Sequence, residues 1–178
     1  GRAADAELLS RQSMVFQKPM LLRRSARANI AFVLRHFDRG TAAERVDEIL
    51  TRARLAHVAS SPARLLSGGE QQRLAIARGL ALDPDLLFLD EPCANLDPAS
   101  TLAVEDMIED ARRAGAKIVL VTHDIGQARR IADDVVFMSA GRVLEHTSAS
   151  AFFAKPQSAA ADAYLSGRLY VDGPAPGR

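Results

Sequence analysis

The sequence predicts an α/β fold with a mostly parallel sheet. Short apolar runs at residues 86–90 and 118–121 have the length and composition of buried strands. Segments with apolar residues at helical spacing lie before, between and after these runs. Because strand-like and helical segments alternate along the chain, we expect helices to connect neighbouring strands that run in the same direction.

The N-terminal third is predicted to be mainly helical. Residues 1–11 form a loop or a helical lead-in, and a short strand at 13–16 is stopped by the proline of Lys18-Pro19. After this point apolar residues recur every three or four positions, with arginines and acids between them. This spacing predicts helices at residues 25–34 and 43–55, followed by a loop at 59–62.

The stretch LSGGEQQR, residues 66–73, is typical of a turn that opens a helix. Ser67 and Glu70 have the S-x-x-E spacing of a capping box, which fixes where the helix begins. Gly68 and Gly69 let the backbone approach a ligand closely, and a helix N-terminus favours an anion. The stretch therefore predicts a phosphate-facing turn.

An acidic pair follows soon after this turn. The predicted helix at 71–82 is ended by Asp83-Pro84, and the strand at 86–90 ends in Asp90 and Glu91. A buried parallel strand delivers such side chains to the carboxyl edge of its sheet. A phosphate-contacting turn followed by a strand-end acidic pair indicates nucleotide chemistry.

The C-terminal half continues the alternation of helices and strands. Asp97-Pro98 has the order of an N-cap followed by proline at the first helical position, and Gly115 lies just past the expected end of that helix at Arg113. The inner face of this helix is predicted to contain Leu102, Met107, Ile108 and Ala111. The remaining predicted elements are a strand at 118–121 presenting His123, a helix at 125–132, a hairpin of 135–138 with 143–144, a helix near 158–166 and a disordered tail at 172–178.

Bulk properties indicate an ordinary globular protein. At 178 residues, with 48% hydrophobic and 25% charged residues, the chain is long enough for one domain with a sizeable core. The single Cys93 excludes an intrachain disulfide, and we assign it no redox role. No apolar stretch approaches the roughly 20 residues that cross a bilayer, and no signal peptide is visible. We therefore expect a cytosolic chain, and the lack of an initiator methionine indicates that Gly1 is not its natural start.

Five motifs together resemble the nucleotide-binding subunit of ABC transporters. LSGGEQQR is similar to the family's signature, LLFLDEP to the Walker B strand with its following glutamate, Asn95-Leu96-Asp97 to the D-loop, and Val121-Thr122-His123-Asp124 to the H-loop. Upstream, Val15-Phe16-Gln17-Lys18-Pro19 is similar to the Q-loop. The motifs occur in the family's order between residues 12 and 147. The resemblance implies a P-loop NTPase fold of the ABC type with an inserted helical subdomain.

The resemblance also implies a division of the chain. Residues 1–19 would be the end of the core lead-in with the Q-loop, and residues 20–66 the helical subdomain that docks on the membrane subunit. Residues 67–150 would be the catalytic core with the other four motifs, and residues 151–178 a C-terminal helix with a flexible tail. Without the resemblance, residues 20–66 predict only amphipathic helices packed on a core.

For the carboxyl edge of the sheet, the resemblance implies ATP and Mg²⁺ as ligands. Asp90 would orient the magnesium ion, usually through water, and Gln17 would touch the same ion. Glu91 would polarise the attacking water, and His123 would sense the γ-phosphate and complete the charge-stabilising ring around it. The alternatives from the residues alone are a turn glutamine, an acidic pair that caps the next turn and a structural histidine.

For Ser67, Gly68 and Gly69, the resemblance implies contact with the nucleotide of the opposite subunit. Two chains would sandwich two nucleotides head to tail as a homodimer, with Asp97 at the same seam. The capping box explains Ser67 and Glu70 equally well, and both interpretations are compatible. A lone chain should then hydrolyse ATP poorly.

One part of the family pattern is missing from the sequence. The phosphate loop, G-x-x-x-x-G-K-[ST], requires a Gly-Lys pair, and the three lysines Lys18, Lys117 and Lys155 do not form one. The N-terminal strands and an adenine-stacking aromatic have no counterpart either. Two explanations remain: an N-terminally truncated transport ATPase, which the missing methionine favours, or a short protein without the main phosphate grip. Either chain should bind ATP weakly or not at all by itself, and its sheet should lack strands that protect its edge.

The predicted function is the ATP-hydrolysing subunit of an importer, peripheral on the cytoplasmic face of the membrane. The segments VFQKP at 15–19, LLRRS at 21–25 and AYLSGRL at 163–169 are most similar to tungstate-type oxyanion importers. The implied partners are permease subunits, a second copy of the chain and, indirectly, a periplasmic or lipoprotein solute-binding protein. One alternative is a non-catalytic remnant that keeps only docking surfaces. Another is a nucleic-acid-associated ABC ATPase, although residues 17–66 are too few for heptad arms and no basic patch suggests nucleic acid.

Overall fold

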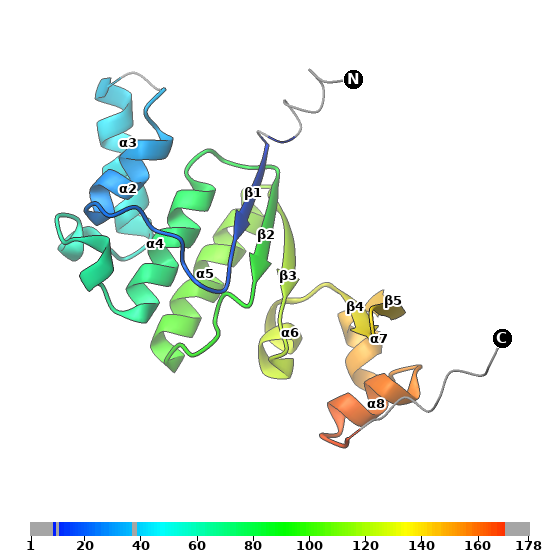
Figure 1. Ribbon diagram of the computed structural model, residues 1–178. Coiled ribbons are helices and arrows are strands. Elements are labelled where there is room, and N and C mark those ends of the chain that lie inside the picture. The colour runs from blue at the N-terminus through cyan, green and yellow to red at the C-terminus, as the bar shows by residue number, and fades with distance from the viewer. Residues whose placement is uncertain (1–8, 10, 37–38, 170–178) are drawn as a thin grey trace. The chain divides into compact units, whose positions relative to one another are not determined.

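The computed structural model describes residue 9, residues 11–36 and residues 39–169 (Figure 1). The tail predicted at 172–178 and most of the lead-in predicted at 1–11 lie outside the described residues. The chain divides into two compact units, Gly1–Thr122 and His123–Arg178, which are taken separately below.

The first unit contains a parallel sheet whose middle strand carries the acidic pair. Within the described residues the sheet has the order β1 (Gln12–Val15), β2 (Leu86–Asp90) and β3 (Lys117–Val121). Both pairings are parallel, with Val15 opposite Leu89 and Leu89 opposite Leu120. The predicted α/β fold with a parallel sheet is confirmed here.

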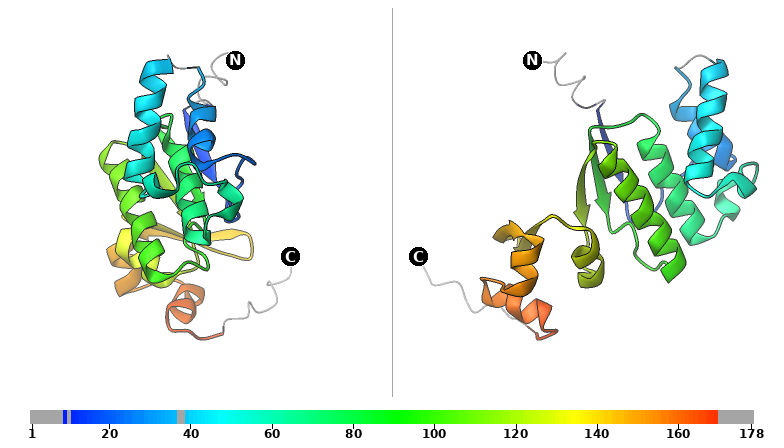
Figure 2. Two further views of the ribbon diagram at one scale, coloured as in Figure 1. Left: turned by 90° about the vertical axis from the view of Figure 1, so that its left-hand side faces the viewer. Right: turned by 180° about the vertical axis from the view of Figure 1, so that it is seen from behind.

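Four helices and two 3₁₀ turns complete the described part of this unit. Helices α4 and α5 run side by side on one face of the sheet (Figure 2), and α2 packs against α3 and α4. None of the helices in the described ranges is both long and apolar enough to pass through a membrane. The elements are α2 (Ala26–Val33), α3 (Arg39–Arg52), η1 (Ala56–Val58), η2 (Ala63–Leu65), α4 (Gly68–Leu80) and α5 (Pro98–Arg113).

Several helix boundaries differ from the predicted ones. Helix α3 begins four residues before the predicted start and ends at Arg52 rather than at 55. Its end is set by Arg54, which adopts a left-handed φ of 56°, while the amide of Leu55 donates to the carbonyl of Leu50 at 2.7 Å. This is the arrangement that glycine usually supplies at a helix end, so the sequence carried no signal for it.

The two core helices show how far capping chemistry predicts a helix. Helix α4 begins at Gly68, where its capping box places it, rather than at 71. Helix α5 spans the predicted range, and Gly115 past its end has a φ of 100°. The prediction of Leu102 on the inner face was wrong, since its side chain is 57% exposed. Met107, Ile108 and Ala111 are buried as predicted.

The two faces of the sheet differ in cover. Leu87 and Leu89 on the helix-facing side are fully buried. On the other side the register aligns Met14 with Phe88 and Phe88 with Val119, and Met14 and Val119 are 52% and 39% exposed. The strand predicted at 118–121 is confirmed as β3, but the prediction that it is buried was wrong. Parallel sheets normally carry helices on both faces, and in the described part of the first unit only one face has them.

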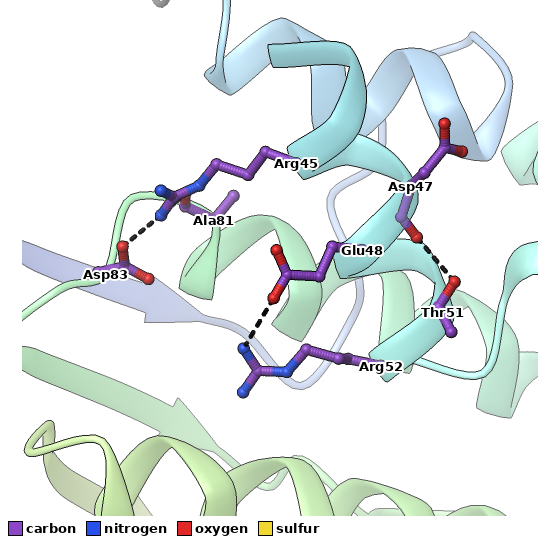
Figure 3. A network of polar contacts seen from close by, with 7 residues as sticks. All are labelled: Arg45, Asp47, Glu48, Thr51, Arg52, Ala81 and Asp83. Atoms are coloured by element: carbon purple, nitrogen blue, oxygen red, sulfur yellow. Dashed lines mark hydrogen bonds and ion pairs between the residues drawn. The ribbon is translucent and has the colours of Figure 1, made fainter. Parts of the chain in front are cut away.

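Arginines tie the helical segment to the core (Figure 3). Arg45 donates to the carbonyl of Ala81 at 3.2 Å and forms an ion pair with Asp83, so α3 is held to the end of α4. Farther along, Arg73 on α4 donates to the carbonyl of Ala53 at 3.1 Å. Exposed ion pairs contribute about 0–1 kcal/mol each, so the pair of Arg45 with Asp83 adds little to the free energy of unfolding.

As far as residue 169, the second unit consists of a hairpin and three short helices. Ala140 and Gly141 have positive φ values of 47° and 74°, the combination of a type I′ turn, and they join the antiparallel strands of the predicted hairpin. Both strands are longer than predicted because the pairing continues to Asp134 and Ser148. The elements are α6 (Ile125–Ile131), β4 (Asp134–Ser139), β5 (Arg142–Ser148), α7 (Ala149–Ala154) and α8 (Ala159–Leu165).

A buried carboxylate and a ring cluster hold this unit together. Phe137 on β4 lies 5.7 Å, between ring centroids, from both Phe152 and Tyr164. The buried Glu145 on β5 accepts from the amide of Gln157 at 3.0 Å and from the amide and hydroxyl of Ser158, each at 2.6 Å. Burial alone would raise the pKa of Glu145, but these hydrogen bonds outweigh it and the pKa is lowered.

Glu145→Gln should destabilise the second unit by about 2 kcal/mol, because a neutral amide replaces a charged acceptor that receives three hydrogen bonds. A lowered pKa means that the wild-type carboxylate stabilises the fold above the ordinary glutamate range, and that this contribution is lost as the pH falls toward the lowered pKa. Urea unfolding at several acidic pH values, with Arg142→Gln as an exposed control on the same strand, measures both effects. Equal acid sensitivity of wild type and Glu145→Gln would contradict this assignment.

Candidate functional site

The polar residues that follow the three described strands lie at the carboxyl edge of the sheet. Val15, Leu89 and Leu120 are aligned in neighbouring strands. Two residues after them come Gln17, Glu91 and Thr122, in that order. Since parallel strands end at a common edge, this register brings the Q-loop glutamine and the acidic residue to one side of the sheet. The grouping of Gln17 with the acidic pair follows from strand pairing alone.

Glu91 has an unusual backbone. Its φ is 46°, in the left-handed region that side chains rarely occupy, while its amide still donates to the carbonyl of Val121 at 2.8 Å. The hydroxyl of Thr122 approaches its carboxylate at 3.5 Å. The backbone hydrogen bond to Val121 thus holds Glu91 beside β3 in a conformation that has a steric cost. Such strain is characteristic of functional positions.

The residues at this edge fit a magnesium ion held mainly by a nucleotide. Within the described ranges no group of three or more histidines, cysteines and acids could hold a metal by itself. Magnesium keeps several waters and binds through one or two carboxylates together with substrate phosphates. Asp90, at the end of β2, and Gln17 supply oxygen donors of this kind. The donor set fits the ion, with most of its coordination left to water and phosphate.

The signature turn is a complete capping box. The hydroxyl of Ser67 accepts from the amide of Glu70 at 3.3 Å, and the carboxylate of Glu70 accepts from the amide and hydroxyl of Ser67 at 2.8 Å each. These hydrogen bonds, the backbone one first, lower the pKa of Glu70. The structural interpretation of Ser67 and Glu70 is thus confirmed. It leaves the ligand interpretation open, because the first amides of a helix have no acceptor inside that helix.

Asp97 caps α5 as predicted. Its carboxylate accepts from the amides of Ala99 and Ser100, each at 3.0 Å. The hydrogen bond from the side chain of Ser100 is the largest cause that lowers the pKa of Asp97. Helices α4 and α5 pack together, and their first turns lie toward the same end of the unit (Figure 1). The signature turn and Asp97 therefore form a second group of site residues at neighbouring helix starts.

His123 opens the second unit and is described within it. Its side chain is exposed, and its backbone carbonyl accepts from the hydroxyl of Tyr164 at 2.6 Å. The next residue, Asp124, caps α6 by accepting from the amide of Gln127 at 2.9 Å. These contacts order the backbone around the histidine, and its role toward a phosphate stays a prediction.

Sequence reasoning missed Asn29, which fixes the loop between Gln17 and α2. Its buried side chain accepts from the amide of Leu22 at 2.8 Å and donates to the carbonyls of Leu22, Arg24 and Ser25. The only available signal was a polar residue at a position of α2 that faces the core. The geometry shows that the Q-loop region is anchored to the helical segment.

The first unit and its edge residues have the organisation of an α/β nucleotide-binding domain of the P-loop type. The family model described as ABC transporter matches residues 3–94, more than half of the chain, and the chain belongs to this family. A similar solved structure is CbiO1 from Clostridium perfringens, described as part of the ABC transporter complex CbiONQ. It is 31% identical, with a TM-score of 0.78 over 87% of this chain. The match spans 64% of the length of CbiO1.

At position 91 we expect glycine to be more stabilising than alanine, which is the reverse of their order inside a helix. Glu91→Gly should be more stable than Glu91→Ala by about 1 kcal/mol, because only glycine adopts a positive φ without a steric cost. At the exposed helical position 106, Asp106→Ala should instead be the more stable of the same pair by about 1 kcal/mol. Urea unfolding of the four variants measures both differences. The same order at the two positions would show that the backbone at 91 is not strained.

Proposed function

We propose that this chain is the ATP-binding and ATP-hydrolysing subunit of an ABC importer, acting with a second copy head to tail. Membership of the ABC transporter family supports the class of protein. The single observation that carries hydrolysis is the strained Glu91, held at the strand end by the carbonyl of Val121 and approached by the hydroxyl of Thr122.

The residues divide the chemistry between them. A bound magnesium ion would neutralise charge on the phosphates, with Asp90 and Gln17 as its protein-side donors. Glu91 would orient the attacking water and accept its proton, and His123 would donate toward the γ-phosphate. Ser67, Gly68 and Gly69 would offer helix-start donors to the nucleotide held by the other copy, with Asp97 at the same seam.

The loop that binds the β- and γ-phosphates would lie outside these 178 residues. The sequence has no Gly-Lys pair, so its own lysines cannot supply the loop that holds the β- and γ-phosphates. The exposed face at Met14 and Val119 and the unpaired outer edge of β3, within the described sheet, are a suitable place for a further strand and helix. This open face supports the truncated form over a protein that functions without the loop.

An apolar groove beside the Q-loop would receive the membrane partner. Its volume is about 490 Å³, and exposed Met20 and Phe32 line it together with the half-buried Arg78, whose pKa is lowered by burial. Asn29 anchors Leu22 in the same wall. An apolar groove of this volume suits a short helix of a permease, and its position next to Gln17 would let the partner's movement reach the nucleotide. CbiO1 is itself part of a complex, which supports a partnered role.

The proposed cargo is an oxyanion such as tungstate, delivered by a periplasmic or lipoprotein binding protein. The segments at 15–25 and 163–169 support this subtype by their similarity to such importers. The chain would then work at the cytoplasmic face of the membrane. Because the binding protein and the permease select the solute, uptake of labelled tungstate by cells with and without this chain tests the cargo directly.

Glu91→Gln should lower the rate of MgATP hydrolysis by the assembled transporter about 100-fold or more, because the amide cannot accept the proton of the attacking water. MgATP binding should persist, since the ion and the phosphates are held elsewhere. Phosphate release and nucleotide binding are the two measurements, and Glu109→Gln on the exposed side of α5 is the matched control. If the wild-type assembly neither binds nor hydrolyses MgATP, the chain is the non-catalytic remnant that keeps only docking surfaces.

Charge placed in the groove should abolish assembly with the permease. Met20→Glu and Phe32→Glu each put a carboxylate on an exposed apolar wall, so folding should be unchanged while co-purification with membrane subunits falls at least tenfold. Leu65→Glu, equally exposed but outside the groove, is the control. Equal co-purification of all three variants would show that the groove is not the docking site.

A further inference from the structure

The signature turn and the start of α5 touch at one point. A β-carbon added to the buried Gly69 would lie 2.2 Å from the hydroxyl oxygen of Ser100 and 2.7 Å from its β-carbon. No side chain fits into such a space, so the backbone of α4 rests directly on Ser100. The neighbouring Gly68 is different, because a β-carbon there would meet nothing within 4 Å.

The same serine also holds Asp97. The carboxylate of Asp97 accepts from the Ser100 amide at 3.0 Å, and the side chain of Ser100 is the largest cause of the lowered pKa of that carboxylate. Ser100 therefore contacts the signature turn with its side chain, whose hydroxyl oxygen is the atom nearest to Gly69, and the aspartate with its backbone amide. One residue joins two motifs that are separated by about thirty positions in the sequence.

We infer that Ser100 is a positioning residue that couples the signature turn at Gly69 to Asp97, so that the two motifs keep one fixed geometry. The inference rests on the proposed function for its consequence: both motifs would face the partner copy, and a displacement of either would carry the other with it. Hydrolysis would then require the turn and Asp97 to reach the second nucleotide together.

The contact geometry explains why serine suits this position. Alanine would keep the β-carbon but lose the hydroxyl oxygen, which is the atom nearest to Gly69 and the side-chain atom that lowers the pKa of Asp97. Threonine would keep a hydroxyl but add a methyl group where α4 and α5 are already in contact. Glycine would remove both the hydroxyl and the β-carbon, which are the two atoms that a side chain at position 69 would strike.

The first test needs no nucleotide. In the full chain, Ser100→Ala should raise amide hydrogen exchange at least threefold in peptides covering both 68–74 and 97–101. Gly69→Ala should raise exchange of the 68–74 peptide at least tenfold or unfold the chain, and the double variant Gly69→Ala with Ser100→Gly should recover most of this loss. Gly68→Ala is the matched control and should leave exchange unchanged, because its site is open.

Two outcomes of this test would overturn the coupling. One is a change confined to 97–101 in Ser100→Ala. The other is a double variant that is no better folded or protected than Gly69→Ala. Rescue by Ser100→Gly separates a specific contact from general instability, because Ser100→Gly alone weakens α5.

The second test measures the consequence in the assembled transporter. Ser100→Ala should reduce kcat for MgATP about tenfold and change KM less than twofold, since Ser100 touches neither the nucleotide nor the catalytic edge in this proposal. An unchanged kcat would overturn the positioning role. If the wild-type assembly shows no hydrolysis, the proposed function fails, and the exchange experiment still decides whether the two motifs are coupled.

Discussion

The candidate site depends on the parallel pairing of β2 with the strands on both sides of it. Leu89 stands between Val15 and Leu120, and this register fixes where Gln17, Glu91 and Thr122 emerge. The pairing also continues one step beyond the strand, because the amide of Glu91 donates to the carbonyl of Val121. A slip of one residue would turn every side chain of β2 to the other face, bury Asp90 against α4 and α5, and remove the site.

The second constraint is the close approach of α4 and α5. Gly69 allows the first turn of α4 to rest on Ser100, and the capping residues Ser67 and Asp97 lie at the two helix starts. The two constraints are physically independent, since one is a backbone ladder and the other a side-chain contact. They explain why the candidate site residues form two groups, one at the carboxyl edge of the sheet and one at the starts of α4 and α5.

The sequence predicted the features that depend on local chemistry. The capping box at Ser67, the Asp97-Pro98 helix start and the apolar strand at 86–90 are each specified by a few adjacent residues, and each was confirmed. The end of α3 was missed because Arg54 takes a conformation that usually requires glycine. The exposure of Val119 was missed because burial depends on which elements cover a face, and no local pattern states that one face is left open. The roles of Asn29 and Ser100 are tertiary, and nothing in their neighbouring residues indicates them.

Under the proposed function, this chain would carry the hydrolytic residues of an ABC ATPase, and the loop that holds the phosphates would lie outside residues 1–178. The most direct measurement is the coding sequence immediately upstream of the codon for Gly1. We expect an in-frame segment that encodes a strand followed by G-x-x-x-x-G-K-[ST]. That strand would pair with the open edge of β3, and the helix after it would cover the exposed face at Met14 and Val119. A start codon or an in-frame stop without that motif would contradict the proposed function. The chain would then be a remnant that keeps its docking and dimer surfaces but does not bind ATP.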